Sequence, residues 1–220
     1  MAMIKGVIFD MDGVMVDTER QLTEGYEAVA KQIGIEIPRW LTDSFKGASH
    51  ELSERHFNDY FKGKIDYWEI RKLRDKYVDK LREKEGIPVK KGLFELLNYI
   101  KDNGMVCAVA TSTKHEVAEN ILKDAGAWPY LNAMVYGDEV KRGKPEPDIF
   151  LKAAKDLGLD TSEVIVIEDS INGIRAGHAA GIKVVHVPDM IKIDDDVKAL
   201  TYKVRDSLND VIAIIEELNK

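Results

Sequence analysis

Short apolar runs recur along most of the chain, and stretches with helical periodicity lie between them. The runs are rich in valine and isoleucine and lack polar alternation, which is typical of strands covered on both faces. They span residues 4–9, 105–110, 134–136, 164–167 and 183–187. The helical stretches span residues 93–100, 115–125, 148–157, 171–179 and 208–218. Strands that alternate with helices in this way predict an α/β fold, a doubly wound parallel sheet.

Glycines support the predicted helix ends. One glycine follows each of four helical stretches, at Gly104, Gly126, Gly158 and Gly181. A glycine at this position commonly adopts a left-handed conformation and caps the last turn. We therefore expect these four residues to end their helices.

Residues 18–85 break the alternation, because no strand-like run falls among them. Their apolar positions recur at the spacing of a helix face instead. The pattern is clearest in residues 22–33, 50–61 and 67–81. An all-helical insert is therefore expected between the first strand and the rest of the sheet.

Domain boundaries follow from this insert. We expect an α/β core formed by residues 1–16 and 87–220 and a helical cap domain formed by residues 17–86. A helical module that is hinged beside the end of a strand is placed to act as a lid over a site there.

Composition narrows the class of protein. The 220 residues are 45% hydrophobic and 32% charged, which is ordinary for a soluble globular protein. The net charge of −7 argues against nucleic acid or an anionic membrane as a partner, but it allows a phosphate ester in a locally positive pocket. No apolar run approaches the ~20 residues of a membrane span, and we see no secretory signal. The single cysteine, Cys107, excludes an internal disulfide and fits a reducing compartment, so we expect a cytoplasmic protein. We also expect the protein to be a monomer.

Two aspartates, Asp10 and Asp12, follow the first apolar run. Residues i and i+2 of a strand share a face, so both carboxylates can project beyond its C-terminal end, where open parallel sheets place their sites. Neighbouring carboxylates stay ionised only if a cation joins them, or else one of them takes a proton. Either outcome suits phosphate chemistry, in which one carboxylate attacks phosphorus and the other moves a proton. A simple turn is the alternative interpretation of Asp-x-Asp-Gly.

Three further segments carry polar groups that are suited to binding a phosphate or a metal ion. Thr111 and Ser112 follow a strand and precede a helix, where they can bind an anion or merely cap the helix. Lys144 lies between a glycine and a proline and could balance the charge of a carboxylate–phosphate site, although a loop lysine usually faces solvent. Glu168 and Asp169 end a buried strand and need a cationic partner. Oxygen ligands of this kind favour Mg²⁺ over zinc.

We expect no catalytic or metal-binding role for the acidic run 194–196 or for four of the histidines. The acidic run 194–196 is expected to be a solvated loop rather than a metal site. His56, His115, His178 and His186 fall in different predicted elements, so we expect no common ligand set among them.

The order and spacing of these motifs resemble the haloacid dehalogenase superfamily. The motifs are Asp-x-Asp-Gly-Val, a strand ending in Thr-Ser, Gly-Lys-Pro-x-Pro, and a strand ending in Glu-Asp-Ser. Residues 17–19 and 168–174 are similar to the phosphatase and β-phosphoglucomutase branch, and the helical insert stands where first-position caps stand in that superfamily. The resemblance implies a Rossmann-like core and a Mg²⁺-dependent reaction on a small phosphate ester.

The resemblance also implies residue roles. Asp10 would be the nucleophile that forms an aspartyl-phosphate, and Asp12 would protonate the leaving oxygen and then activate water. A carboxylate at Asp12 favours phosphoryl chemistry over dehalogenation. Thr111 and the Ser112 backbone would bind phosphoryl oxygens, and Lys144 would neutralise nucleophile and phosphate. The implied Mg²⁺ ligands are Asp10, the Asp12 carbonyl, Asp169 and Glu168.

Two positions depart from the mutase pattern. His50 stands in place of a cap arginine that would bind a second phosphate, and Leu22 stands in place of a histidine. An imidazole lacks the fork of a guanidinium, so the grip on a second phosphate weakens. We therefore favour a phosphatase, with His50 as a substrate-binding candidate, over a sugar-phosphate mutase. A non-catalytic binding protein on the same fold is disfavoured because the set of reactive residues is intact.

Overall fold

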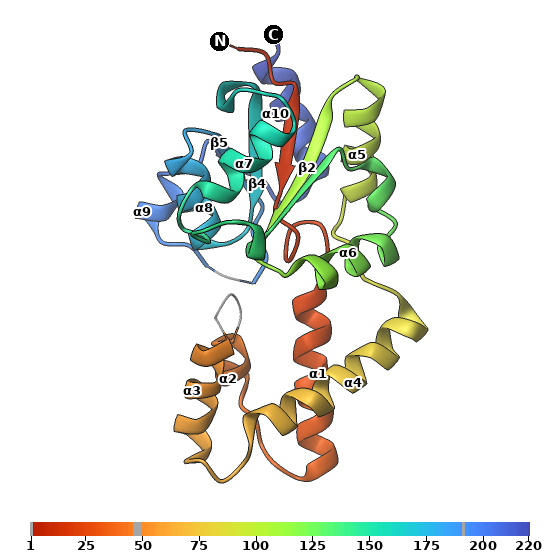
Figure 1. Ribbon diagram of the computed structural model, residues 1–220, viewed down its shortest axis with the longest axis vertical. Coiled ribbons are helices and arrows are strands. Elements are labelled where there is room, and N and C mark those ends of the chain that lie inside the picture. The colour runs from red at the N-terminus through yellow and green to blue at the C-terminus, as the bar shows by residue number, and fades with distance from the viewer. Residues whose placement is uncertain (1, 46–49, 191) are drawn as a thin grey trace. The chain divides into compact units, whose positions relative to one another are not determined.

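A computed structural model describes residues 2–45, 50–190 and 192–220, and of His50 the backbone alone. The chain divides into two compact units (Figure 1). Met1–Asp17 and Ile87–Lys220 form one unit, the core, and Thr18–Gly86 forms the other, the cap.

The core is built on a six-stranded parallel sheet with the order β3-β2-β1-β4-β5-β6. The strands are β1 (Gly6–Phe9), β2 (Val106–Thr111), β3 (Ala133–Tyr136), β4 (Val164–Glu168), β5 (Lys183–His186) and β6 (Lys203–Val204). From the central β1 the chain first extends the sheet through β2 and β3, and it then returns to add β4, β5 and β6 on the other side. The predicted doubly wound α/β fold is confirmed.

The register of the central strands brings the polar segments together. Phe9 in β1 is level with Val109 in β2 and Ile167 in β4. Residues that follow these three positions therefore emerge at the same C-terminal edge. The order of the strands reverses between β1 and β4, and open α/β sheets bind their ligands at such a point.

Helices cover both faces of this sheet (Figure 1). Along β1, Val7 and Phe9 belong to one apolar cluster and Ile8 to the other, as the alternation of a strand requires. The first cluster includes residues of α5 (Leu93–Asp102), α6 (His115–Asp124) and α10 (Asn209–Leu218). The second includes residues of α7 (Asp148–Asp156), α8 (Ile171–Ala179) and α9 (Asp195–Lys198). Burial on both faces explains why the strands read as continuous apolar runs.

The described residues of the cap form four helices: α1 (Thr18–Ile33), α2 (Arg39–Asp43), α3 (His50–Phe61) and α4 (Tyr67–Glu85). The unit has its own apolar cluster, which contains Tyr26, Val29, Leu41, Phe57, Tyr67 and Ile70. Asp66 starts α4 by accepting a 2.9 Å hydrogen bond from the backbone N–H of Glu69. The guanidinium of Arg74 lies 4.8 Å from the centre of the Tyr26 ring, so a buried cation is accommodated between α1 and α4.

Three elements of the structure differ from the sequence prediction. The sequence patterns did not indicate α2 and β6, and the acidic run 194–196 leads into the short helix α9 rather than a loop. Its aspartates are exposed, as expected, and they favour a helix N-terminus. The four helix-ending glycines all have positive φ angles, between 65° and 74°. Among the described residues, no helix combines the length and apolar character that crossing a membrane requires.

Candidate active site

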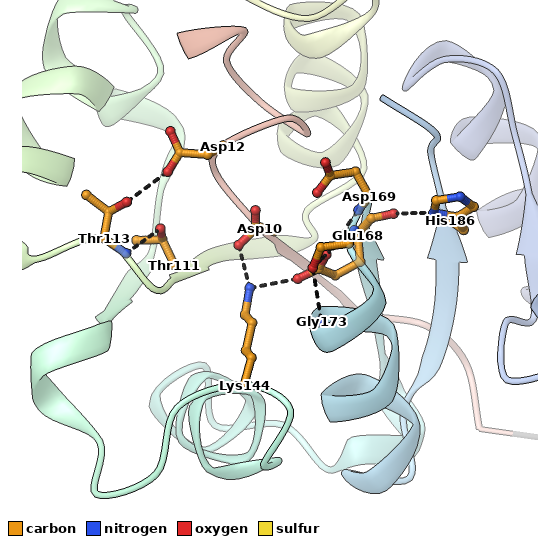
Figure 2. A network of polar contacts seen from close by, with 10 residues as sticks. Asp10, Asp12, Thr111, Thr113, Lys144, Glu168, Asp169, Gly173 and His186 are labelled. Carbon is orange, nitrogen blue, oxygen red and sulfur yellow. Dashed lines mark hydrogen bonds and ion pairs between the residues drawn. The ribbon is translucent and has the colours of Figure 1, made fainter. Parts of the chain in front are cut away.

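Lys144 lies at the centre of a buried charge cluster at the C-terminal edge of the sheet (Figure 2). Its ammonium group contacts Asp10 Oδ1 and donates a 2.7 Å hydrogen bond to Glu168 Oε1. The Lys144 side chain is only 5% exposed, so the usual solvent-facing position of a loop lysine does not apply here. Its Nζ also lies 4.9 Å from the centre of the Phe150 ring, which leaves one wall of the cluster apolar.

Glu168 is fully buried and uses both carboxylate oxygens within the chain. Oε1 accepts the bond from Lys144, and Oε2 accepts bonds from the backbone N–H groups of Asp169 and Ser170 and from the Ser170 hydroxyl, at 2.9–3.0 Å. A methyl group at Gly173 would lie 1.6 Å from Oε1, so only glycine fits there. The local packing therefore aims Glu168 at Lys144.

Three buried carboxylates, those of Asp10, Glu168 and Asp169, each offer an oxygen within 4.8 Å of the others. Burial raises the pKa of Asp10 to about 7, although Lys144 opposes the shift. Burial, with the charge of Glu168, raises the pKa of Asp169 to about 9. Burial lowers the pKa of Lys144, but the charges of Asp10 and Glu168 outweigh it and the net shift is upward. Three carboxylates thus share one ammonium, and a bound cation would relieve their repulsion.

A glycine makes room for the third carboxylate. Gly13 has a φ of 85°, in the left-handed region that favours glycine, and a Cβ there would lie 2.3 Å from Asp169 Oδ2. The glycine of the Asp-x-Asp-Gly motif therefore serves both the turn after Asp12 and the approach of Asp169.

Asp12 is half-buried and meets the segment after β2. Thr113 Oγ1 donates a 2.8 Å hydrogen bond to Asp12 Oδ2, and the Thr113 backbone N–H donates one of 3.1 Å to Thr111 Oγ1 (Figure 2). Thr111 is buried, whereas the Ser112 side chain is exposed. Sequence reasoning missed Thr113; the available signal was a third hydroxyl residue directly after Thr111 and Ser112.

The structure places the predicted residues in two groups. Asp10, Lys144, Glu168 and Asp169 form the charge cluster, and Asp12 is joined to Thr111 through Thr113. The His50 side chain and residues 46–49 lie outside the described residues, so the substrate-binding prediction for His50 stays a prediction.

One histidine lies against the site. His186 is buried in β5, and its Nδ1 donates a 3.1 Å hydrogen bond to the backbone carbonyl of Glu168. Burial lowers the pKa of His186, which favours the neutral ring. This histidine therefore supports the backbone at Glu168.

Comparison with known proteins identifies the family. The family described as haloacid dehalogenase-like hydrolase matches residues 7–187. The chain belongs to the haloacid dehalogenase-like hydrolase family. The family predicted from the four motifs is thereby confirmed.

Similar proteins carry phosphatase and mutase names. A phosphorylated carbohydrates phosphatase from Thermotoga maritima is 32% identical over 189 residues, which cover 83% of this chain and 84% of that protein. Hexitol phosphatase A from Escherichia coli is 33% identical over 183 residues, covering 83% and 82%. A solved β-phosphoglucomutase structure from Clostridium difficile has a TM-score of 0.75 and 26% identity, covering 99% of this chain and 97% of that one.

Proposed function

We propose that the protein is a Mg²⁺-dependent phosphatase that hydrolyses a small phosphorylated metabolite, such as a sugar phosphate, through an aspartyl-phosphate on Asp10. The observation that carries this proposal is the buried cluster in which Lys144 pairs with Asp10, while Asp12 is held separately by Thr113. Family membership supports hydrolase chemistry, and the names of the two curated relatives support phosphorylated carbohydrates as the substrate class.

The donor set fits a hard divalent cation. Carboxylate oxygens from Asp10 and Asp169 meet in a buried site with excess negative charge, and Mg²⁺ prefers oxygen ligands. We propose these two carboxylates and the Asp12 carbonyl as ligands. Glu168 is the fourth candidate, and its hydrogen bonds within the chain favour a role through Lys144. Bound Mg²⁺ would polarise the phosphoryl group and neutralise charge that develops during transfer.

Nucleophilic attack, binding of the phosphoryl oxygens and proton transfer are assigned to residues of the chain. Lys144 holds Asp10 Oδ1, which leaves Oδ2 to attack phosphorus. Thr111 Oγ1 accepts the bond from Thr113, so its own hydrogen can be donated to a phosphoryl oxygen. Asp12 would pass a proton to the leaving oxygen and later take one from the attacking water.

Mg²⁺ is expected to stabilise the protein more at about pH 8 than at about pH 5. Without a cation, the folded protein keeps protons on Asp10 up to about pH 7 and on Asp169 up to about pH 9. The unfolded chain releases the same protons near pH ~4. Between these limits the folded state binds more protons, so its stability falls as the pH rises. A cation that pairs with the ionised carboxylates recovers this loss.

Thermal unfolding with and without Mg²⁺ across this pH range measures the effect. Asp169→Asn removes one of the two raised carboxyl groups and should reduce both the pH dependence and the Mg²⁺ increment. An increment that is the same at every pH would contradict the assignment of the cation to these carboxylates.

A substrate panel tests the proposed activity. Sugar phosphates, nucleotides and phosphoglycolate would be incubated with the purified protein and Mg²⁺, and release of inorganic phosphate would be measured. We expect release from at least one sugar phosphate. Activity on nucleotides alone would contradict the proposed substrate class, and release from no member of the panel would count against the phosphatase itself.

A separate assay distinguishes phosphatase from mutase. Given β-glucose 1-phosphate and glucose 1,6-bisphosphate, the protein is expected to release inorganic phosphate or leave the sugar unchanged. The reason is that His50, in place of an arginine, offers a weaker grip on a second phosphate. Rapid formation of glucose 6-phosphate without net phosphate release would make the mutase interpretation correct.

A further inference from the structure

Thr113 joins two functional groups from different parts of the core: Asp12 lies in the segment after β1, and Thr111 ends β2. Its hydroxyl donates to Asp12 Oδ2 at 2.8 Å, and its backbone N–H donates to Thr111 Oγ1 at 3.1 Å. Figure 2 shows Asp12 turned toward Thr113 and Asp10 turned toward Lys144. Two aspartates separated by one residue are thus held by different partners.

The segment that carries Thr113 is itself held by the end of β3. The backbone N–H of Gly137 donates a 3.3 Å hydrogen bond to the Thr113 carbonyl. A Cβ at Gly137 would lie 2.4 Å from the Ser112 carbonyl oxygen, so the two backbones approach as closely as glycine allows. Asp138 Oδ1 accepts a 3.3 Å bond from the backbone N–H of His115. The position of Thr113 is therefore fixed by contacts outside the reacting groups.

We propose that Thr113 is a positioning residue for Asp12: its hydrogen bond to Oδ2 orients the Asp12 carboxyl group for proton transfer. The proposal rests on the phosphatase function proposed above. A threonine hydroxyl has one hydrogen to donate, and Oδ2 can accept it both as a carboxylate oxygen and as the carbonyl oxygen of the neutral acid. The same bond therefore persists in both protonation states of Asp12.

Over one catalytic cycle each bond that forms to phosphorus is matched by one that breaks, and the proton returns to Asp12. As Asp10 Oδ2 forms its bond to phosphorus, the bond from phosphorus to the leaving oxygen breaks, and the proton on Asp12 moves to that oxygen. Water then attacks phosphorus and gives a proton back to Asp12, and the bond from phosphorus to Asp10 Oδ2 breaks, which releases inorganic phosphate and the Asp10 carboxylate. Thr113 keeps its own proton throughout.

Leaving groups of different basicity test this role. An alkyl leaving group needs the proton from Asp12, whereas p-nitrophenolate leaves with little assistance. Thr113→Val removes the hydroxyl at nearly constant shape, and Thr113→Ser keeps it. Both variants retain the backbone N–H that binds Thr111, so that contact is matched between them.

We expect Thr113→Val to lower kcat/KM for glycerol 2-phosphate at least ~10-fold, since a positioned general acid contributes roughly 10²–10⁴-fold. For p-nitrophenyl phosphate the same variant should stay within about threefold of the parent, and Thr113→Ser should stay within about threefold on both substrates. Equal losses on the two substrates would show a general structural or phosphate-binding role, and unchanged values would show no role. Either result would overturn the proposal.

A structural measurement covers the case in which the parent hydrolyses neither substrate, an outcome that would count against the phosphatase proposal. Crystal structures of the parent, Thr113→Val and Thr113→Ser would be compared at Asp12. We expect the Asp12 carboxylate to leave its position in Thr113→Val alone. An unchanged carboxylate in that variant would overturn the positioning role whatever the activity.

Discussion

Replacement of Asp10 by asparagine is expected to reduce turnover below about 1% of the parent rate, because loss of a nucleophile usually lowers kcat by several powers of ten. The amide is nearly the same size as the carboxylate, but it is a poor nucleophile and a weaker metal ligand. Lys144 keeps its hydrogen bond to Glu168 in this variant, so the buried ammonium retains a charged partner and the fold should persist.

A matched control for Asp10→Asn is Asp124→Asn, the same chemical change at an exposed position at the end of α6. Turnover by the control should equal that of the parent. Phosphate release and thermal unfolding would be measured on all three proteins after removal of contaminating phosphatases. Residual activity of Asp10→Asn above about 1%, in a folded protein, would count against Asp10 as the nucleophile.

Removal of divalent cations is the second change with a large expected effect. Activity should disappear in excess chelator and return when Mg²⁺ is added, because the buried carboxylates of Asp10 and Asp169 need a cation to remain ionised together. Ca²⁺ should inhibit rather than replace Mg²⁺. It accepts more ligands at longer distances, and this would disturb the alignment of nucleophile, phosphorus and leaving oxygen.

The measurement is phosphate release after dialysis against chelator, with Mg²⁺ or Ca²⁺ then titrated back. Thermal unfolding under the same conditions separates a catalytic requirement from simple stabilisation. Full activity in excess chelator would exclude the proposed metal role, and equal activation by Ca²⁺ would contradict the geometric argument.

Much of the core could be predicted because its signals are periodic. Strands buried on both faces appear as short apolar runs, and helix ends are marked by glycines such as Gly104 and Gly181, whose positive φ angles the structure confirms. The register of β1 between β2 and β4 then explains why motifs far apart in the sequence meet at one edge. The reactive residues could be found because each one lies at or shortly after the end of a strand, or in a constrained loop.

The features that sequence reasoning missed depend on side-chain direction or on very short elements. A two-residue strand such as β6 carries no periodicity to detect. The bond from Thr113 to Asp12 and the support of Glu168 by His186 depend on where loops place individual atoms. The pairing of Lys144 with the nucleophile was implied by the family resemblance alone and not by its neighbours in sequence, because the acidic partners that hold it lie 134 and 24 residues away.

The most direct test of the proposed mechanism is to detect the phosphoryl group on the protein during turnover. A reaction with a sugar phosphate that the panel shows to be hydrolysed would be quenched in acid within milliseconds, and peptides would be examined by mass spectrometry. An aspartyl-phosphate mechanism predicts an addition of about 80 Da on Asp10 that appears before inorganic phosphate and is absent from Asp10→Asn. A phosphoryl group on any other residue, or steady hydrolysis with no phosphorylated protein under conditions that trap it, would contradict the mechanism.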